Sequence, residues 1–380
     1  MRKIGILTLT GKEYNHHMGA VLQAYALQKT LDKLGFSSEI IDFIPTLYRE
    51  NKFFIDQFKR SVVTRGLTNT IIVSIGTIMR LRQRKRCYYD FKSNYMTFTS
   101  DSFNSLEDLK EITDVYDAFI VGSDTVWMPQ LGVKNLEAYL LKFAEDTNTK
   151  ISYAASIWYP IPLSLCPLYK TLIERLDFVS VREKTSLMYL KQCGVKKDIK
   201  VVLDPTLLLS QKEYRNIAKV PNIIPDKPYI FYYDVHLSKG LFQKVISFAK
   251  KTGHSVVTET AIPRGVMKEV YSFYGYGPPE FLGLIQNSDL VITTSFHGTV
   301  FSVIFKKQFY SIKSDFAPST KIIDFLESIG LQDRFISLDE LKKRIIHDKP
   351  IEWDSIEKNL KENIDLSLSF LKMALKGVRK

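Results

Sequence analysis

Short runs of β-branched and aromatic residues alternate with amphipathic segments of helix length through almost the whole chain. This alternation predicts parallel β-sheets covered by helices, because each parallel strand needs a crossover connection to reach the next one. In the first half, Met18–Leu34 places its apolar residues on one stripe and stops at Gly35, as a helix would. The strand-like runs of this half are Ile4–Leu9, Ser38–Phe43, Ala118–Ser123, Ile151–Ser156, Phe178–Glu183 and Val201–Pro205.

The alternation comes in two sets, which a polar, proline-containing stretch from Leu208 to Pro228 separates. With 380 residues the chain is long enough for two domains. We predict an N-terminal α/β domain over residues 1–207 with a basic helical insertion at about 45–95, a C-terminal α/β domain over 208–350, and an amphipathic helix over 351–380. The second set contains the strand-like runs Tyr229–Val235, Ser255–Thr260, Leu290–Ser295 and Phe309–Ile312.

The composition bounds the class of protein. A hydrophobic content of 45% with 25% charged residues is ordinary for a soluble globular enzyme and argues against disorder, while the net charge of +12 indicates anionic partners. Cys87, Cys166 and Cys193 are far apart and lack metal-ligand spacing, which favours a reducing compartment and argues against a disulfide framework or a structural zinc. The first apolar run is too short for a signal peptide. We therefore expect a cytoplasmic location.

One segment is unusually basic. Gly66–Met79 is apolar but too short and too polar to span a bilayer, and the run Arg80–Arg86 follows it. In the interpretation that we favour, this is a surface helix with a solvated basic end. In the other, it is a membrane-surface element that attracts anionic headgroups, which would place the protein peripherally at the inner face of the membrane.

Four polar clusters stand directly after strand-like runs, where ligands bind in parallel α/β folds. Gly11–Ala20 contains Gly19 at a predicted helix start, which lets a ligand approach backbone N–H groups; the alternative is a solvent-exposed loop, and the signal by itself is weak. In Gly122–Trp127, Asp124 can accept a proton from a sugar hydroxyl and Trp127 can pack on a sugar face. The alternative there is a helix-capping aspartate with a core tryptophan.

The other two clusters carry cationic or titratable groups. In Ser180–Lys184, Arg182 offers a planar fork to a phosphate or a carboxylate, or else forms a structural ion pair with Glu183 or another acid. In Ser295–Gly298, His297 is expected at the rim of a cleft and at the N-terminus of the next helix, which favours a nearby phosphate. A buried histidine is usually structural, but the position after a strand favours a site.

These clusters, in this order, resemble the polysaccharide pyruvyl transferase family. The matching elements are NHHMGAVLQAYAL, AFIVGSDTVW, YAAS, FVSVREK, VVLDPTLLL and LVITTSFHG, and the likeness spans roughly residues 1–335. The resemblance implies an α/β fold with two Rossmann-like domains facing a cleft, similar to the GT-B glycosyltransferase architecture. The domain over 1–207 would then bind the acceptor and the domain over 208–350 the donor.

The implied reaction moves the pyruvyl unit of phosphoenolpyruvate onto two hydroxyls of one sugar, forming a cyclic ketal and releasing phosphate during surface polysaccharide or capsule biosynthesis. In the matching positions, Arg182 would bind the anionic donor, His297 would act as general acid and Asp124 as general base. Lys321 stands where many relatives carry an arginine. The substrate-binding residues would be Asn15, Gly19, Ser123, Trp127, Ser295, Gly298, Thr299 and Lys321. No metal and no cofactor beyond this co-substrate is expected.

Two other function classes stay open. A metal-independent glycosyltransferase of GT-B type would use a nucleotide sugar, and the absence of a D-x-D sequence argues only against the metal-dependent class. A non-catalytic protein that binds anionic surfaces would use Arg80–Arg86. We expect a sugar acceptor, including a lipid-linked oligosaccharide, and no nucleic acid, because the basic run is short and lacks interleaved aromatics.

Overall fold

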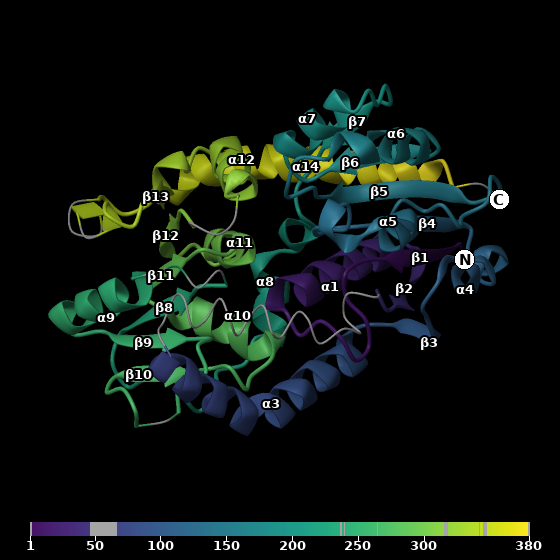
Figure 1. Ribbon diagram of the computed structural model, residues 1–380. Helices are drawn as coiled ribbons and strands as arrows, with labels where there is room; N and C mark the ends of the chain where they lie inside the picture. Colours follow the sequence, from purple (N-terminus) through teal and green to yellow (C-terminus); the bar gives the residue numbers. More distant parts are fainter. Residues whose placement is uncertain are drawn as a thin grey trace. The chain divides into compact units, whose positions relative to one another are not determined.

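The computed structural model describes residues 2–45, 67–235, 238, 240–263, 265–314, 318–341, 343–344 and 348–378 (Figure 1). The chain forms two compact units. Unit 1 comprises Met1–Glu50, Lys92–Leu209 and Lys358–Lys380, and unit 2 comprises Asn51–Phe91 and Ser210–Glu357. Each unit contains one parallel sheet with helices in the connections between its strands.

The sheet of unit 1 has seven parallel strands in the order β3-β2-β1-β4-β5-β6-β7. Its central strands are buried: Ile6 of β1 pairs with Ile40 of β2 and with Ile120 of β4. The order reverses between β1 and β4, so the connections from these two strands leave in opposite directions. The strands are β1 (Lys3–Leu7), β2 (Ser37–Phe43), β3 (Phe98–Phe103), β4 (Ala118–Val121), β5 (Thr149–Ala155), β6 (Phe178–Val181) and β7 (Ile199–Val201).

The sheet of unit 2 has six parallel strands in the order β10-β9-β8-β11-β12-β13, and its order reverses between β8 and β11. This is the strand order of a dinucleotide-binding Rossmann sheet. The strands are β8 (Tyr229–Tyr233), β9 (Ser255–Thr258), β10 (Val270–Ser272), β11 (Leu290–Thr293), β12 (Gln308–Ile312) and β13 (Phe335–Ile336).

The helices of unit 1 begin with α1 (Met18–Lys33), which ends where Gly35 adopts a positive φ of 83°, as the sequence predicted. The others are α4 (Leu106–Lys110), α5 (Val133–Tyr139), α6 (Cys166–Glu174) and α7 (Lys184–Gln192). Unit 2 contains α8 (Gln211–Ile217), α9 (Leu241–Thr252), α10 (Pro278–Asn287), α11 (Phe296–Ile304) and α12 (Thr320–Ile329). Two long helices, α3 (Leu67–Tyr95) and α14 (Trp353–Lys376), contribute residues to both units. The prediction of an α/β fold with two Rossmann-like domains is confirmed.

The observed units differ from the predicted ranges 1–207, 208–350 and 351–380 in two segments. Residues of the basic insertion as far as Phe91 belong to unit 2, because Arg80 and Arg84 of α3 donate hydrogen bonds to the carbonyls of Ile262 and Tyr274. Most of α14 belongs to unit 1. There the Ser367 hydroxyl accepts a hydrogen bond from the Leu203 amide. Local sequence patterns cannot show that a segment packs into a unit formed mainly by distant parts of the chain.

The expectation against disulfides is wrong for one pair of cysteines. Cys166, the first residue of α6, is bonded to Cys193, the C-cap residue of α7, with their Cα atoms 4.8 Å apart. Cys87 lies in α3 and takes no part in a disulfide. The two bonded residues are 27 positions apart in the chain, and only the packing of α6 and α7 brings them together.

Among the described residues, no helix is both long enough and apolar enough to cross a bilayer.

Candidate functional site

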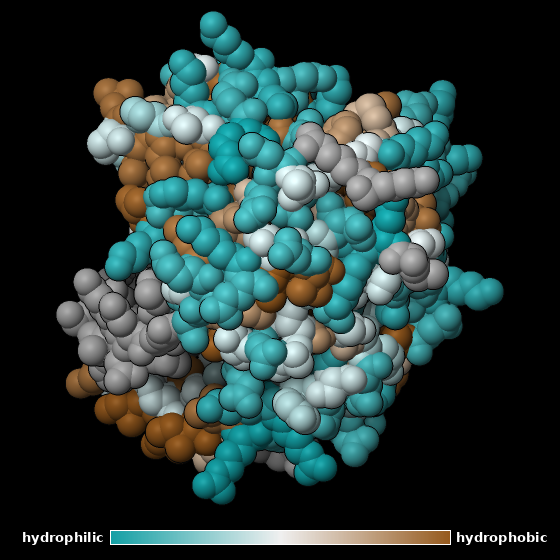
Figure 2. All heavy atoms as spheres, turned by 90° about the vertical axis from the view of Figure 1, so that its right-hand side faces the viewer, coloured by the Kyte–Doolittle hydropathy of each residue, from teal (hydrophilic) through white to brown (hydrophobic). Residues whose placement is uncertain are grey.

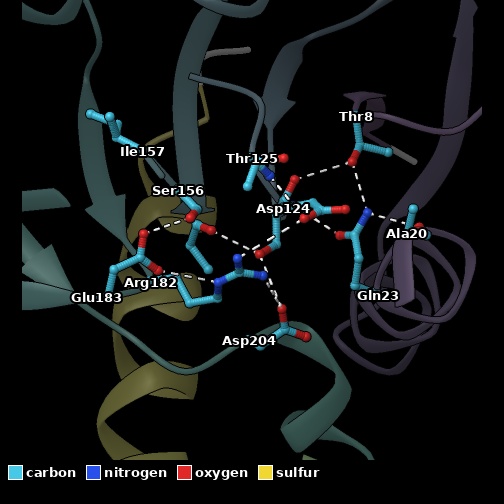
Figure 3. A network of polar contacts seen from close by, with 12 residues as sticks. Thr8, Ala20, Gln23, Asp124, Thr125, Ser156, Ile157, Arg182, Glu183 and Asp204 are labelled. Carbon is cyan, nitrogen blue, oxygen red and sulfur yellow. Dashed lines mark hydrogen bonds and ion pairs between the residues drawn. The ribbon is translucent and has the colours of Figure 1, made fainter. Parts of the chain in front are cut away.

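In unit 1 the polar residues gather where the strand order reverses, directly after β1 and β4. Thr8 follows β1, and Ser123 follows β4. Gln23 of α1 joins them: its Nε2 donates to the Thr8 hydroxyl at 2.8 Å, and its Oε1 accepts from the Ser123 amide at 3.0 Å (Figure 3). The Thr8 hydroxyl also donates to the Ser123 carbonyl at 3.2 Å. This buried network fixes the backbone that presents the next residue, Asp124.

Asp124 has a strained backbone and a partly accessible carboxylate. Its φ of 70° lies in the left-handed region, which aspartate tolerates better than most residues. The Asp124 carbonyl accepts hydrogen bonds from the amides of Val126 and Ser156, which hold this conformation. Oδ1 accepts from the Thr125 amide at 2.9 Å, and 15% of the side chain is exposed. Asp124 is therefore a carboxylate held rigidly at a strand end that still reaches solvent.

Arg182, directly after β6, is buried among three carboxylates (Figure 3). Its guanidinium lies 2.9 Å from Asp204, 3.3 Å from Glu183 and 4.0 Å from Asp124. Burial alone lowers the pKa of Arg182, but the charges of Glu183, Asp204 and Asp124 outweigh it and raise that pKa above its ordinary value. One cation and three anions give this cluster a net charge of −2 when all are ionised.

This electrostatic arrangement does not match the expected role of Arg182 as the cation for an anionic donor. A cluster with a net negative charge repels phosphate and carboxylate groups. Arg182 instead forms a structural ion pair with Glu183 and Asp204, which was the alternative interpretation of its sequence. Two fully buried acids, Asp204 and Glu183, fix the guanidinium, which places a positive charge 4.0 Å from the Asp124 carboxylate.

The sequence interpretation missed the roles of Asp204 and Glu183. Asp204 Oδ1 accepts from the amide and the hydroxyl of Thr206, at 3.0 and 2.7 Å. Glu183 Oε1 accepts from the hydroxyls of Ser156 and Ser186. The available signal for Asp204 was its place near the end of the strand-like run VVLDP, close to the kind of position that singled out the four clusters.

The other predicted site residues of unit 1 have structural surroundings. Trp127 is fully buried, its indole N–H donates to the Tyr139 carbonyl at 2.8 Å, and its ring offers no exposed face to a sugar. This is the core tryptophan of the alternative interpretation. Ser123 is buried and donates to the Ala154 carbonyl at 2.8 Å. Asn15, with a φ of 53°, closes its loop by donating to the Leu9 carbonyl, and Gly19 is buried in the first turn of α1.

In unit 2 the corresponding reversal lies between β8 and β11, and Asp234 follows β8 there. The Asp234 carboxylate accepts from the Tyr232 hydroxyl at 2.8 Å and from the Thr294 hydroxyl at 2.7 Å. It also accepts from the amide of Ser238 at 2.8 Å. The sequence interpretation did not select Asp234, although it too stands directly after a strand.

His297 is the second residue of α11 and follows the Ser295 cap, whose hydroxyl accepts from the Gly298 amide at 3.3 Å. The imidazole ring packs edge-on against Phe296, with the ring centres 5.2 Å apart. His297 is only 4% exposed, which differs from the expected position at the rim of a cleft. Its position at the N-terminus of a helix is as predicted.

Around His297, the predicted small and hydroxyl residues are packed within unit 2. A Cβ atom at Gly298 would overlap the Thr293 hydroxyl, so this glycine provides space for the protein's own strand and not for a ligand. The Thr299 hydroxyl donates to the Ser295 carbonyl at 3.0 Å and lies 2.7 Å from the Ser311 hydroxyl. Lys321 is half-buried in the first turn of α12.

The structure thus brings Asp124, Arg182 and Ser123 together in unit 1, and His297 together with Ser295, Gly298 and Thr299 in unit 2. Among the described residues, no group of three or more His, Cys, Asp and Glu side chains is arranged to hold a metal ion. Each group occupies the strand-order reversal of its own sheet, which is where open α/β sheets bind ligands.

The sequence profile described as Polysaccharide pyruvyl transferase matches residues 17–315, and this range contains Asp124, Arg182, Asp234 and His297. The chain belongs to the polysaccharide pyruvyl transferase family. These four residues therefore lie in the part of the chain that the family shares, while Asn15 and Lys321 lie just outside it. No curated protein sequence is significantly similar to this family member.

Solved structures show how this pyruvyl transferase family member is built. UDP-GlcNAc 2-epimerase from Methanocaldococcus jannaschii aligns with a TM-score of 0.57 and 12% identity, covering 99% of this chain and 100% of the epimerase. The Rickettsia bellii UDP-N-acetylglucosamine 2-epimerase gives 0.56 and 11%, covering 100% and 97%. The Neisseria meningitidis enzyme gives 0.52 and 11%, covering 99% of each chain. Likeness at this identity shows a shared two-domain fold of the GT-B type.

Proposed function

We propose that this protein transfers the pyruvyl group of phosphoenolpyruvate to two hydroxyls of a sugar in surface polysaccharide or glycoconjugate biosynthesis. The observation that carries the proposal is the family match over residues 17–315. Asp124 and His297 lie within that range, each at the strand-order reversal of its sheet.

In this reaction both acceptor hydroxyls lose a proton. One oxygen adds to C2 of the donor while the vinyl CH2 gains a proton and becomes a methyl group. Phosphate then leaves, the second hydroxyl oxygen closes the ketal at C2, and the second proton ends on phosphate. The chemistry requires a group that takes a proton from a hydroxyl and a group that gives one to carbon.

Asp124 suits the first task. Its carboxylate is partly exposed, whereas Asp204 and Glu183 behind it are buried and committed to Arg182. The hydrogen bond from the Thr125 amide orients the carboxylate, and the Arg182 guanidinium lies 4.0 Å from it, so little reorganisation is needed when a hydroxyl approaches. Since the cluster is negatively charged, it suits a neutral sugar better than the donor. Arg182 is thus a positioning residue for Asp124.

His297 suits the second task, since the imidazole is the side chain that most readily gives and takes protons near neutral pH. The N–H groups in the first turn of α11 point out of the N-terminus of the helix, and such a terminus stabilises a departing phosphate. Lys321 in the first turn of α12 supplies a cation in the same unit. No cofactor is needed besides phosphoenolpyruvate as co-substrate.

The test is incubation with phosphoenolpyruvate and a panel of sugar acceptors, including lipid-linked oligosaccharides. Release of phosphate that depends on the acceptor, with a product heavier by one pyruvate ketal, supports the proposal. Nucleotide diphosphate release from UDP- or GDP-sugars, without reaction of phosphoenolpyruvate, would instead establish a glycosyltransferase.

A further inference from the structure

The helix α3 has two chemically different faces. Its inner face packs on unit 2 so closely that a Cβ atom at Gly76 would overlap the carbonyl oxygen of Ala261. Arg84 is buried on this face, forms an ion pair of 2.8 Å with Glu259, and stacks over the Tyr274 ring at 4.6 Å. This face therefore anchors α3 to the rest of unit 2, while several side chains on the opposite face are exposed.

These contacts change which cations of the Arg80–Arg86 run are accessible. Arg84 is held by Glu259, and Arg80 donates to the Ile262 carbonyl at 3.0 Å. Arg82, Lys85 and Arg86 are exposed. Arg86 is 84% exposed and its contact with Asp90 is 3.8 Å long, so this surface pair binds weakly and leaves the cation available.

The outer face of α3 is apolar before it becomes basic. We define this outer face by its exposed residues, which recur at helical spacing: Leu67, Ile71, Ile75, Ile78, Met79, Arg82, Lys85, Arg86 and Tyr89. Ile78 and Met79 are 74% and 71% exposed. Figure 2 shows apolar side chains gathered at the lower left, at the level at which Figure 1 draws α3. A contiguous exposed apolar stripe of this kind marks an interaction surface.

We propose that the outer face of α3 binds the surface of an anionic lipid bilayer. Ile71, Ile75, Ile78 and Met79 would enter the boundary between headgroups and acyl chains, while Arg82, Lys85 and Arg86 would bind anionic headgroups. Tyr89, at the basic end, has the amphipathic ring that membrane interfaces favour. The proposal rests on the exposed side chains of α3 and is independent of the reaction proposed above.

A bilayer fits this surface better than a nucleic acid does. A phosphate backbone accounts for the three exposed cations but gives the isoleucine stripe no partner. An anionic bilayer accounts for both, because it offers negative charge at its surface and apolar chains directly below. Along α3 the apolar residues come first and the basic residues follow. Both kinds belong to the outer face of the helix.

The experiment is co-sedimentation of the full-length protein with vesicles at low ionic strength. Vesicles of phosphatidylcholine alone are compared with vesicles that also contain phosphatidylglycerol. Two variants test the outer face of α3: Arg82→Gln with Lys85→Gln and Arg86→Gln, and Ile78→Ser with Met79→Ser. The matched control removes three exposed charges elsewhere, as Lys250→Gln, Lys251→Gln and Lys361→Gln.

We expect the wild type to bind the phosphatidylglycerol vesicles, and to bind them less as salt is added. The charge variant should lose about a hundredfold in partitioning, since each of the three cations near an anionic surface contributes about fivefold. The serine variant should lose at least about tenfold, and the control less than about threefold. Circular dichroism and urea unfolding confirm that each variant is folded.

Three outcomes would overturn the proposal. The first is no binding of the wild type to either vesicle, and the second is an equal loss in the control and in the charge variant. The third is a wild-type oligomer that Ile78→Ser with Met79→Ser dissociates, measured by analytical ultracentrifugation. That result would assign the outer face of α3 to a second copy of the chain.

Discussion

Arg182 Nη1 donates a hydrogen bond of 2.9 Å to Asp204 Oδ2, and both side chains are almost completely buried in unit 1. Removing one partner leaves an unpaired charge in the interior, which costs about 3–5 kcal/mol. We predict that Arg182→Met lowers the free energy of unfolding by that amount, and that Arg182→Lys restores part of it because the charge returns without the fork. Urea unfolding measures both.

An exposed ion pair is the control for this prediction. Lys244 and Asp339 lie 2.8 Å apart with largely exposed side chains, so Lys244→Met should cost less than about 1 kcal/mol. Equal losses for Arg182→Met and Lys244→Met would show that the buried cluster contributes no special stability.

Asp124→Asn should remove the general base while keeping the fold. Asparagine also accepts the hydrogen bond from Thr125 and tolerates a φ of 70°. We expect acceptor-dependent phosphate release to fall by about 10²–10⁴ while the midpoint of urea unfolding changes little. Asp117→Asn, at the opposite end of β4, is the matched control and should keep its activity. Near-normal turnover by Asp124→Asn would exclude the assignment.

His297→Ala should lose both turnover and stability, because the ring is buried against Phe296. Truncation leaves a void, for which a loss of about 1–3 kcal/mol is typical. His297→Gln fills more of that space, so it should recover stability without recovering turnover. Recovery of turnover by His297→Gln would show that the imidazole is structural and not the general acid.

Lys92 gives the protein a pH-dependent stability. Its ammonium group is buried and donates to the carbonyls of Gly11 and Tyr14 at 2.6 and 2.8 Å. Burial lowers the pKa of Lys92 from 10.5 to about 7, against a smaller opposite effect of Asp42. Between about pH 7 and pH 10.5 the unfolded chain keeps a proton on Lys92 that the folded chain has released. The free energy of unfolding therefore rises with pH through this range.

The measurement compares wild type with Lys92→Met by urea unfolding from neutral to alkaline pH. The unfolding free energy of the wild type minus that of Lys92→Met should increase as pH rises from about 7 toward 10, by at most about 1.4 kcal/mol per pH unit. A difference that stays constant over this range would mean that Lys92 is charged in the folded protein.

The disulfide between Cys166 and Cys193 closes a loop with a sequence separation of 27. A loop of this length stabilises the folded state by about 3–4 kcal/mol by restricting the unfolded chain. We expect Cys166→Ser with Cys193→Ser to lose roughly this amount in urea unfolding under non-reducing conditions. Cys87→Ser, outside the disulfide, is the control. A loss confined to Cys87→Ser would refute the pairing.

Much of the fold and part of the candidate site could be predicted from local sequence. The strand-like runs and the glycine after α1 depend on neighbouring residues, and so does the rule that ligand-binding residues follow strands. That rule selected Asp124 and Arg182 correctly as neighbours of strand ends. It passed over Asp204 and Asp234, because nothing local distinguishes an aspartate that completes a network from one that merely caps a turn.

The role of Arg182 shows the limit most clearly. The local sequence of an arginine after a strand is the same whether its guanidinium faces a phosphate or three carboxylates. The acids around Arg182 meet it only because strands β4, β6 and β7 lie in one sheet. Similarly, the run Arg80–Arg86 shows its charge in the sequence, but only the packing of α3 reveals that Arg84 is buried.

The amino-acid sequence alone determined the α/β class, the two successive sets of strands and the polar residues that end them, because hydrophobic periodicity and turn chemistry act over a few residues. The tertiary structure decided which of those side chains meet, which cations remain accessible, and which cysteines bond. These properties arise from contacts between segments distant in the chain, whose free energies depend on burial and on charges that the local sequence does not contain.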